Sequence, residues 1–287
     1  MNFEGKITEV ILGSKEQAIT IGGQASLPFI GPRKIPAIGL VLSDEGVQLP
    51  RGVPNPYPKV CINDLISWAK YCEKNYPVNA LMVKFSNETK APQLLEELIN
   101  AISVPLIISG SGEREKDKEI IKKCGEIAEG ENLLLCSVEL EDYKSIAATA
   151  LAYDHTVVAE SPIDINIAKQ LNILLTDFGL PLERIVIDPL VAALGYGLEY
   201  TFSVMERIRA QAFNGDKLLA SPIVCFAFNG WRAREASFEY EEWGALAERG
   251  ILWEAMTASS LYSVGADLIV FQHPQSITLF RQLLEVQ

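Results

Sequence analysis

The chain has 287 residues, and its 37 acidic side chains against 25 basic ones give a formal net charge of −12. A surface of that sign repels phosphate backbones and anionic lipid, which argues against partners of either class, nucleic acid or membrane. The chain contains no apolar run near the roughly 18 residues of a membrane span. Its amino terminus lacks the basic and apolar regions of a signal peptide, so we expect a cytoplasmic protein.

Residues 1–35 are predicted to form an amino-terminal extension. Two β-prone runs, residues 9–13 and 18–23, lie close together with a short polar stretch between them. This pattern predicts a β-hairpin within residues 7–30. We expect the hairpin to close the amino-terminal mouth of the domain that follows.

Residues 36–287 repeat one pattern, in which a short apolar run precedes a segment with helical periodicity. Runs that are apolar throughout are typical of parallel strands covered on both faces. The predicted strands are residues 37–42, 80–85, 106–109, 133–136, 157–160, 184–187, 223–226 and 267–271. Eight such units favour a closed (β/α)₈ TIM barrel, forming a single domain of residues 1–287 with the hairpin.

Helices are predicted between these strands from apolar residues at 3.6-residue spacing. Asp164 is the expected N-cap of one helix, and Ser203 that of a helix ending near Asn214. The other helical segments are residues 62–72, 94–102 and 120–127, and two that begin near Glu248 and Gln275. After the seventh strand, residues 227–247 form a long excursion rich in aromatic and charged residues. Such loops usually serve function or interaction.

The five cysteines, Cys61, Cys72, Cys124, Cys136 and Cys225, are an odd number at wide intervals. This does not indicate a disulfide framework, and no pair has the Cys-x-x-Cys spacing that holds a metal or cluster. We expect buried thiols in a reducing compartment, with no metal or iron–sulfur cluster on this chain. His155 and His273 are isolated from each other, and they do not predict a metal site either.

Binding sites of such barrels lie at the carboxyl ends of the strands. The candidate cofactor-binding residues at or near those ends are Gly110, Ser111, Gly112, Ser137, Glu139, Ser161, Asp188, Gly195, Tyr196, Gly197 and Asn229. No nucleophile motif is present, so no catalytic residue is assigned.

The stretch Gly110-Ser111-Gly112 has two interpretations. Its backbone N–H groups could approach a phosphate or a flat cofactor, or the stretch could simply form a tight turn. The dinucleotide fingerprint fails here, because position 115 is Glu115 and not glycine.

Asp188 ends the sixth strand with a carboxylate expected to face the mouth. It could bind the aminopyrimidine edge of a pterin through two hydrogen bonds, or brace its own loop. Lys84 and Glu139 are expected to form an inward ion pair. The segment from Gly195 to Gly197, with Tyr200, could clasp a planar ring, or lead into a helix with a buried tyrosine.

Three stretches resemble one protein family. Residues 161–174, 185–189 and 194–209, the last beginning Leu194-Gly195-Tyr196-Gly197-Leu198-Glu199-Tyr200, are similar to the small subunit of the corrinoid iron–sulfur protein. In archaea this is the delta subunit of the acetyl-CoA decarbonylase/synthase complex. Further similar stretches are residues 130–135, 141–145, 231–236 and 248–255, and the likeness covers about residues 20–275.

The resemblance implies a barrel related to pterin-binding methyltransferases. It implies a heterodimer with a large subunit that carries the iron–sulfur cluster and the cobalamin. Transient partners would be a methyl-pterin methyltransferase and acetyl-CoA synthase, between which cobalt carries a methyl group in the Wood–Ljungdahl pathway. The small subunit would help to enclose the cobalamin and dock these partners without catalysing a step. The chain lacks the Asp-x-His-x-x-Gly signature of one class of cobalamin domains, which agrees with a shared cofactor.

Two other functions stay open. One is a stand-alone pterin-dependent methyltransferase, with Asp188 and either Asp44 or Asn229 holding the pterin. An inward Asp or Asn on an adjacent strand would favour it, but Val138 and Glu139 follow the fourth strand. The other is a structural partner whose mouth binds nothing.

Overall fold

A computed structural model describes residues 4–31 and 34–286. The strands are β1 (Val10–Leu12), β2 (Ile19–Ile21), β3 (Ala37–Ser43), β4 (Ala80–Lys84), β5 (Leu106–Ser109), β6 (Leu134–Val138), β7 (Thr156–Glu160), β8 (Ile185–Asp188), β9 (Val224–Phe226) and β10 (Leu268–Phe271). The α-helices are α1 (Lys59–Ile62), α2 (Leu65–Asn75), α3 (Ala91–Ala101), α4 (Arg114–Ile127), α5 (Tyr143–Ala152), α6 (Ile165–Asp177), α7 (Leu198–Phe213), α8 (Arg234–Ser237), α9 (Leu246–Ser263) and α10 (Pro274–Val286).

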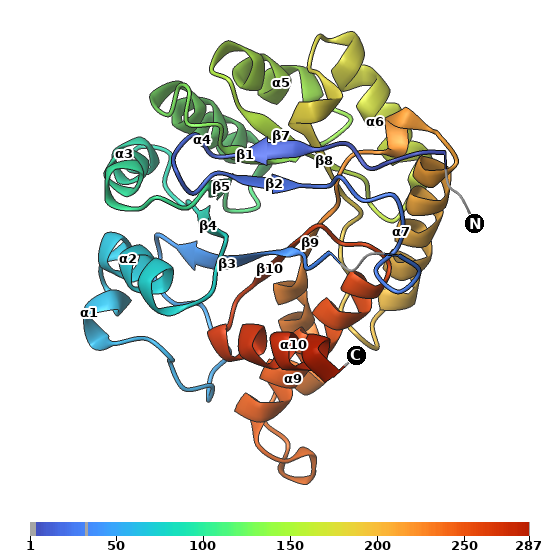
Figure 1. The fold of residues 1–287 in the computed structure, drawn as a ribbon. Coiled ribbons are helices and arrows are strands. Elements are labelled where there is room, and N and C mark those ends of the chain that lie inside the picture. Colours follow the sequence, from blue (N-terminus) through green and yellow to red (C-terminus); the bar gives the residue numbers. More distant parts are fainter. Residues whose placement is uncertain (1–3, 32–33, 287) are drawn as a thin grey trace.

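Strands β3 to β10 form one parallel sheet in the order β8-β7-β6-β5-β4-β3-β10-β9. A parallel bridge between Ile187 and Ile223 joins the two ends of that sheet and closes it into a barrel. The helices surround the strands (Figure 1). The predicted (β/α)₈ barrel is therefore confirmed, and each predicted strand matches an observed one to within two residues at either end.

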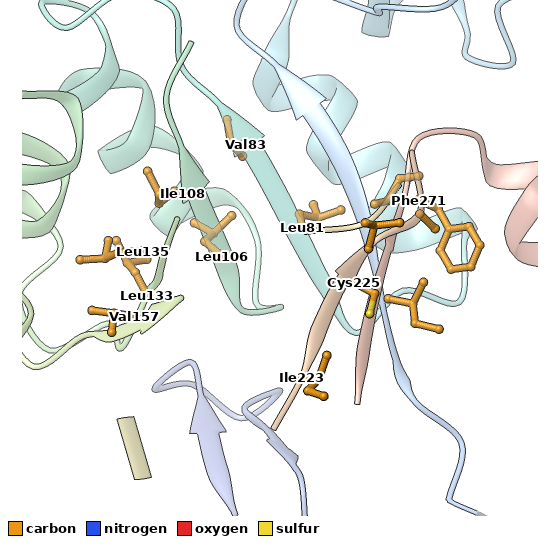
Figure 2. Packing of buried hydrophobic residues seen from close by; sticks show 14 of the residues in the cluster. Leu81, Val83, Leu106, Ile108, Leu133, Leu135, Val157, Ile223, Cys225 and Phe271 are labelled. Carbon is orange, nitrogen blue, oxygen red and sulfur yellow. The ribbon is translucent and has the colours of Figure 1, made fainter. Parts of the chain in front are cut away.

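Side chains of the barrel strands alternate between an outer and an inner layer. Leu81, Val83 and Ile108 belong to the outer layer, which packs beneath the helices (Figure 2). Met82 and Ile107 belong to the inner layer, which fills the barrel. Continuous apolar runs were therefore the correct signal, because both faces of each strand are covered.

The predicted hairpin is present and lies across one end of the barrel (Figure 1). Val10, Leu12 and Ile21 are at most 1% exposed and belong to the same apolar cluster as Met82 and the other inner-layer side chains. The hairpin therefore plugs the end of the barrel opposite the carboxyl ends of its strands, as expected.

Truncating the plug is expected to cost stability. Val10→Ala should lower the free energy of unfolding by about 2 kcal/mol, since it removes two methyl groups and leaves a void. Ile11→Ala is the matched control, because Ile11 is 56% exposed on the same strand. The control should stay within about 0.5 kcal/mol in urea unfolding. Equal losses for the two variants would contradict the plug.

One predicted N-cap is confirmed and the other is wrong. The Asp164 carboxylate accepts a hydrogen bond from the Asn166 N–H at the start of α6. Helix α7 begins at Leu198 and not after Ser203. Gly197, with φ of 103°, allows the chain to turn directly into the helix several residues earlier than the polar N-cap pattern suggested.

A buried ion pair ties α7 to the base of the barrel. The Arg209 guanidinium donates to the Gly265 carbonyl at 3.1 and 2.7 Å and to the Ser221 carbonyl at 3.1 Å. It also pairs with the Asp267 carboxylate, which accepts the Ile223 N–H at 2.8 Å. Arg209 is fully buried and Asp267 nearly so, so each charge depends on the other for its counter-charge.

The five cysteine thiols and His155 are buried. All five cysteines are free and buried. His155 accepts the Leu133 N–H at Nδ1, and its Nε2 lies 2.8 Å from the Gly125 carbonyl. Within residues 4–31 and 34–286, no three His, Cys, Asp or Glu side chains are placed to hold a metal ion. No helix in those ranges is both long and apolar enough to cross a membrane.

A candidate binding site at the mouth of the barrel

Two adjoining cavities open at the carboxyl ends of the strands. The central cavity has a volume of about 400 Å³, and the side cavity one of about 370 Å³. Lys84, Gly110 and Ser111 line both. The inward alternation of the strands carries side chains at or near their ends into the central cavity. These side chains are Lys84, Cys136, Glu160, Asp188 and Phe226.

Asp188 lies at the floor of the central cavity and is 1% exposed. Its Oδ1 accepts the Leu190 N–H at 2.8 Å. Burial, and secondly the nearby Glu160 carboxylate, raise the pKa of Asp188 to about 8. Asp188 therefore keeps a proton at neutral pH, and its position facing the mouth agrees with the prediction.

Polar acceptors surround Asp188. The Ser137 hydroxyl donates to the Glu160 carboxylate. The Asn229 amide nitrogen donates to the Val191 carbonyl at 3.1 Å, which leaves the amide oxygen as its acceptor group. Ser137, Glu160 and Asn229 all line the central cavity, so this part of the wall suits a ligand that donates N–H groups.

Ser161, also predicted to bind a cofactor, lies behind this wall. Its N–H and hydroxyl donate to the Asp188 carbonyl, at 2.8 and 3.2 Å. It is fully buried and is absent from the lining of both cavities. Ser161 is therefore placed to brace the ends of β7 and β8.

Gly110, Ser111 and Gly112 line the central cavity, and their loop bends at Gly112 around the Asp117 carboxylate. The N–H groups of Ser111 and Gly112 donate to the two carboxylate oxygens of Asp117, at 2.7 and 2.8 Å. A Cβ at Gly110 would lie 2.1 Å from the Asp117 carboxyl carbon. These contacts count against the first interpretation, since the chain's own carboxylate already occupies the N–H groups of Ser111 and Gly112.

The predicted ion pair between Lys84 and Glu139 is wrong. The Lys84 ammonium lies over the Phe228 ring, 4.1 Å from its centroid. Glu139 lies just beyond the end of β6 and pairs with Arg114 at 3.5 Å. Burial, and secondly the charge of Arg232, lower the pKa of Lys84. Burial, and secondly the charge of Glu160, raise the pKa of Glu139.

The Gly195-Tyr196-Gly197 segment leads into α7, as the second interpretation had it, but its tyrosines are not buried. Tyr196 and Tyr200 are 51% and 63% exposed and line neither cavity. The Tyr196 hydroxyl donates to the Glu235 carboxylate at 3.0 Å, which joins the segment to the excursion after β9. These residues therefore lie outside the lining of both cavities.

Phe228 and Arg232 were missed by the sequence analysis and line the central cavity. Both lie on a short 3₁₀ helix, Ala227–Arg232, directly after β9. The sequence feature that could have indicated Phe228 is its spacing of two residues from Phe226. That spacing continues the inward face of β9 beyond the end of the strand.

The excursion carries an exposed aromatic tip, defined as Phe238, Tyr240 and Trp243, which are 62, 50 and 37% exposed. The Arg249 guanidinium donates to the carbonyls of Phe238 and Gly244 at 3.0 and 3.4 Å and stacks on the Trp243 ring. The tip projects from the barrel beside α9 (Figure 1). Arg249 therefore holds a solvent-exposed loop in one shape.

Comparison with known proteins points to one family over most of the chain. Residues 9–280 match the family model described as CO dehydrogenase/acetyl-CoA synthase delta subunit. The chain is 35% identical to an acetyl-CoA decarbonylase/synthase complex subunit delta of Archaeoglobus fulgidus, covering 98% of this chain and 68% of that protein. It is also 35% identical to the subunit of that name in Methanopyrus kandleri, covering 95% and 71%.

Among solved structures, similarity extends to dihydropteroate synthases. The enzyme of Xanthomonas albilineans, determined with 4-aminobenzoic acid, superposes with a TM-score of 0.63 at 11% identity over 97% of this chain and 98% of that one. The Thermus thermophilus enzyme superposes with a TM-score of 0.57 at 15% identity, over 96% and 98%. At such low identity, the likeness shows the barrel fold alone.

Proposed function

Because the chain belongs to the family of CO dehydrogenase/acetyl-CoA synthase delta subunits, we propose that it covers one face of a cobalamin held by a large corrinoid iron–sulfur subunit. In this proposal it is a non-catalytic cytoplasmic subunit. It docks a methyl-pterin methyltransferase and acetyl-CoA synthase in turn, while a methyl group passes between them in the Wood–Ljungdahl pathway. The observation that carries the proposal is the open, two-cavity mouth.

The mouth suits a shared corrinoid better than a fully enclosed one. A corrin ring with its amide side chains is larger than either cavity, so the mouth would cover one face and leave the other to the partner. Met82, Phe226 and Phe228 offer apolar contact, and Asn229 and Glu160 offer acceptors for amide N–H groups. The cobalt, when bound, would supply the site that carries the methyl group. This chain's residues would orient the ring and exclude water.

The aromatic tip supports a docking role on the same side of the molecule. Exposed Tyr, Trp and Phe side chains held in one shape are typical of energetically important interface residues. Glu239, Glu241 and Glu242 surround them and are exposed, so the complementary partner surface is basic around an apolar centre. We assign this surface to the large subunit.

Anaerobic co-purification tests the proposal. A tagged chain should retain a larger chain in equal amount, with corrinoid and iron–sulfur absorbance in the visible spectrum. Phe238→Glu should reduce the retained partner about tenfold or more, because it places a charge at an interface centre. Ile127→Glu is the control, since Ile127 is 45% exposed on the last turn of α4 and should leave retention unchanged. A wild-type chain that retains no corrinoid partner would contradict the proposal.

A second candidate is a pterin-dependent methyltransferase acting alone. The observation that favours it is the grouping of Asp188, Glu160 and Asn229. The protonated Asp188 carboxyl offers a donor, and the oxygens of Glu160 and Asn229 offer acceptors, to the polar edge of an aminopyrimidine ring. A colourless chain that purifies alone and binds methyltetrahydrofolate by calorimetry would establish it over the first proposal. A chain that binds neither would leave a structural partner with an empty mouth.

A further inference from the structure

The central cavity contains two cations that its carboxylates do not neutralise. Lys84 and Arg232 both line it, and the charge of one bears on the other. In the described part of the chain, neither has a carboxylate oxygen within 4.0 Å. In a protein of net charge −12, two cations in one cavity without a directly paired carboxylate need an explanation.

The other charged side chains of the cavity are already engaged. Arg114 pairs with Glu139 and Asp142, at 3.5 and 3.0 Å. Lys118 pairs with Glu115 and Asp142, at 2.8 and 3.6 Å. The carboxylate of Asp117 is taken up by the turn at Gly110–Gly112, and that of Glu160 accepts from Ser137. These carboxylates therefore have partners of their own.

The surroundings hold Lys84 in a position to bind a ligand. It points inward from the end of β4, and its ammonium rests on the Phe228 ring in place of an anion. It also lies at the boundary between the two cavities, where Ser43 and Ser86 of the side cavity add hydroxyl groups. Arg232, on the helix that carries Phe228, is exposed and free to fold over a ligand.

We propose that Lys84 and Arg232 form an oxyanion subsite at the mouth, which takes a phosphate group. An ammonium and a guanidinium together suit tetrahedral oxyanions, because both donate charge-assisted hydrogen bonds. The phosphate could belong to the nucleotide tail of a corrinoid or to a free phosphorylated molecule. The subsite does not depend on the proposed corrinoid function, since a phosphate of either origin satisfies it.

Inorganic phosphate is the first probe, titrated into the isolated chain and followed by ³¹P NMR at low ionic strength. Lys84→Gln and Arg232→Gln should each weaken binding about tenfold or more, as expected for loss of a charge-assisted hydrogen bond. Lys118→Gln is the matched control, because Lys118 lines the same cavity but is paired, and it should leave binding unchanged. Arg232 is exposed, so its variant should fold even if the Lys84 variant does not.

A second arm identifies the source of the phosphate. Cobalamin carries a phosphodiester-linked nucleotide tail, whereas cobinamide lacks it. If the tail occupies the subsite, wild-type protein prefers cobalamin to cobinamide and both subsite variants lose that preference. If a free molecule occupies it, phosphate binds and the two corrinoids are not distinguished. An equal loss of phosphate binding in Lys118→Gln, or a chain with neither phosphate binding nor a cobalamin preference, overturns the subsite. Loss of the corrinoid partner in co-purification would instead overturn the proposed function alone.

Discussion

Arg209→Met is expected to lower the free energy of unfolding by about 3–5 kcal/mol, the usual cost of leaving one member of a buried ion pair without its partner. The substitution removes four hydrogen bonds to Gly265, Ser221 and Asp267. It also leaves the Asp267 carboxylate buried at the base of the barrel, where only neutral donors remain. Urea unfolding at neutral pH measures the loss.

Two further variants separate the loss of a buried counter-charge from the other effects of Arg209→Met. Lys169→Met removes the ion pair between Lys169 Nζ and Asp216 Oδ2, which lie 2.7 Å apart. The Lys169 side chain is 44% exposed. The substitution should cost less than about 1 kcal/mol, because the Asp216 carboxylate that remains is still 18% exposed to water and still accepts the Leu218 N–H. Combining Arg209→Met with Asp267→Asn should recover part of the loss, since no uncompensated charge remains. A cost for Arg209→Met as small as that for Lys169→Met would contradict the assigned role.

Asp188→Asn is expected to stabilise the protein increasingly as the pH rises from about 4 to about 8, reaching on the order of a few kcal/mol. The pKa of Asp188 is about 8 in the folded protein, against an ordinary value of 3.8. In this interval the unfolded chain releases the proton while the folded chain retains it. The wild-type protein therefore loses stability with rising pH, and the neutral asparagine does not.

Urea unfolding of both proteins at several pH values gives the difference directly. It should be near zero below pH 4, should grow up to about pH 8 and should stay constant above it. Glu254, whose pKa burial raises to about 7, adds to the wild-type slope but cancels in the difference. Asp164→Asn is the control, because asparagine also caps helices well and should change stability little at any pH. A difference that does not vary with pH would show that Asp188 has no buried proton.

The positions of the barrel strands could be predicted from the sequence because their physical cause is local. Each strand is covered by the hairpin or other strands on one side and by helices on the other, so each appears as a continuous apolar run. The hairpin was visible for a similar reason, since two β-prone runs lie close together. The placement of Asp188 followed from its strand, because the residue that ends a barrel strand lies at the mouth.

The partners of the mouth residues could not be predicted in this way. The N–H groups of the Gly110–Gly112 turn are occupied by Asp117, and Glu139 is paired with Arg114 because α4 starts beside it. Lys84 was consequently left without Glu139 and rests on Phe228. Each of these pairings depends on how a helix or loop packs against the barrel, and the spacing of residues in the sequence does not predict that packing.

The sequence by itself therefore determined the barrel, its plugged end and the strand ends that carry the site, because periodicity and burial are properties of each segment alone. Only the tertiary structure decided which polar groups the chain satisfies internally and which line the cavity without such a partner. Hydrogen bonds and ion pairs are short-range contacts between distant segments, and Asp188, Asn229, Lys84 and Arg232 came to line one cavity only when the barrel closed.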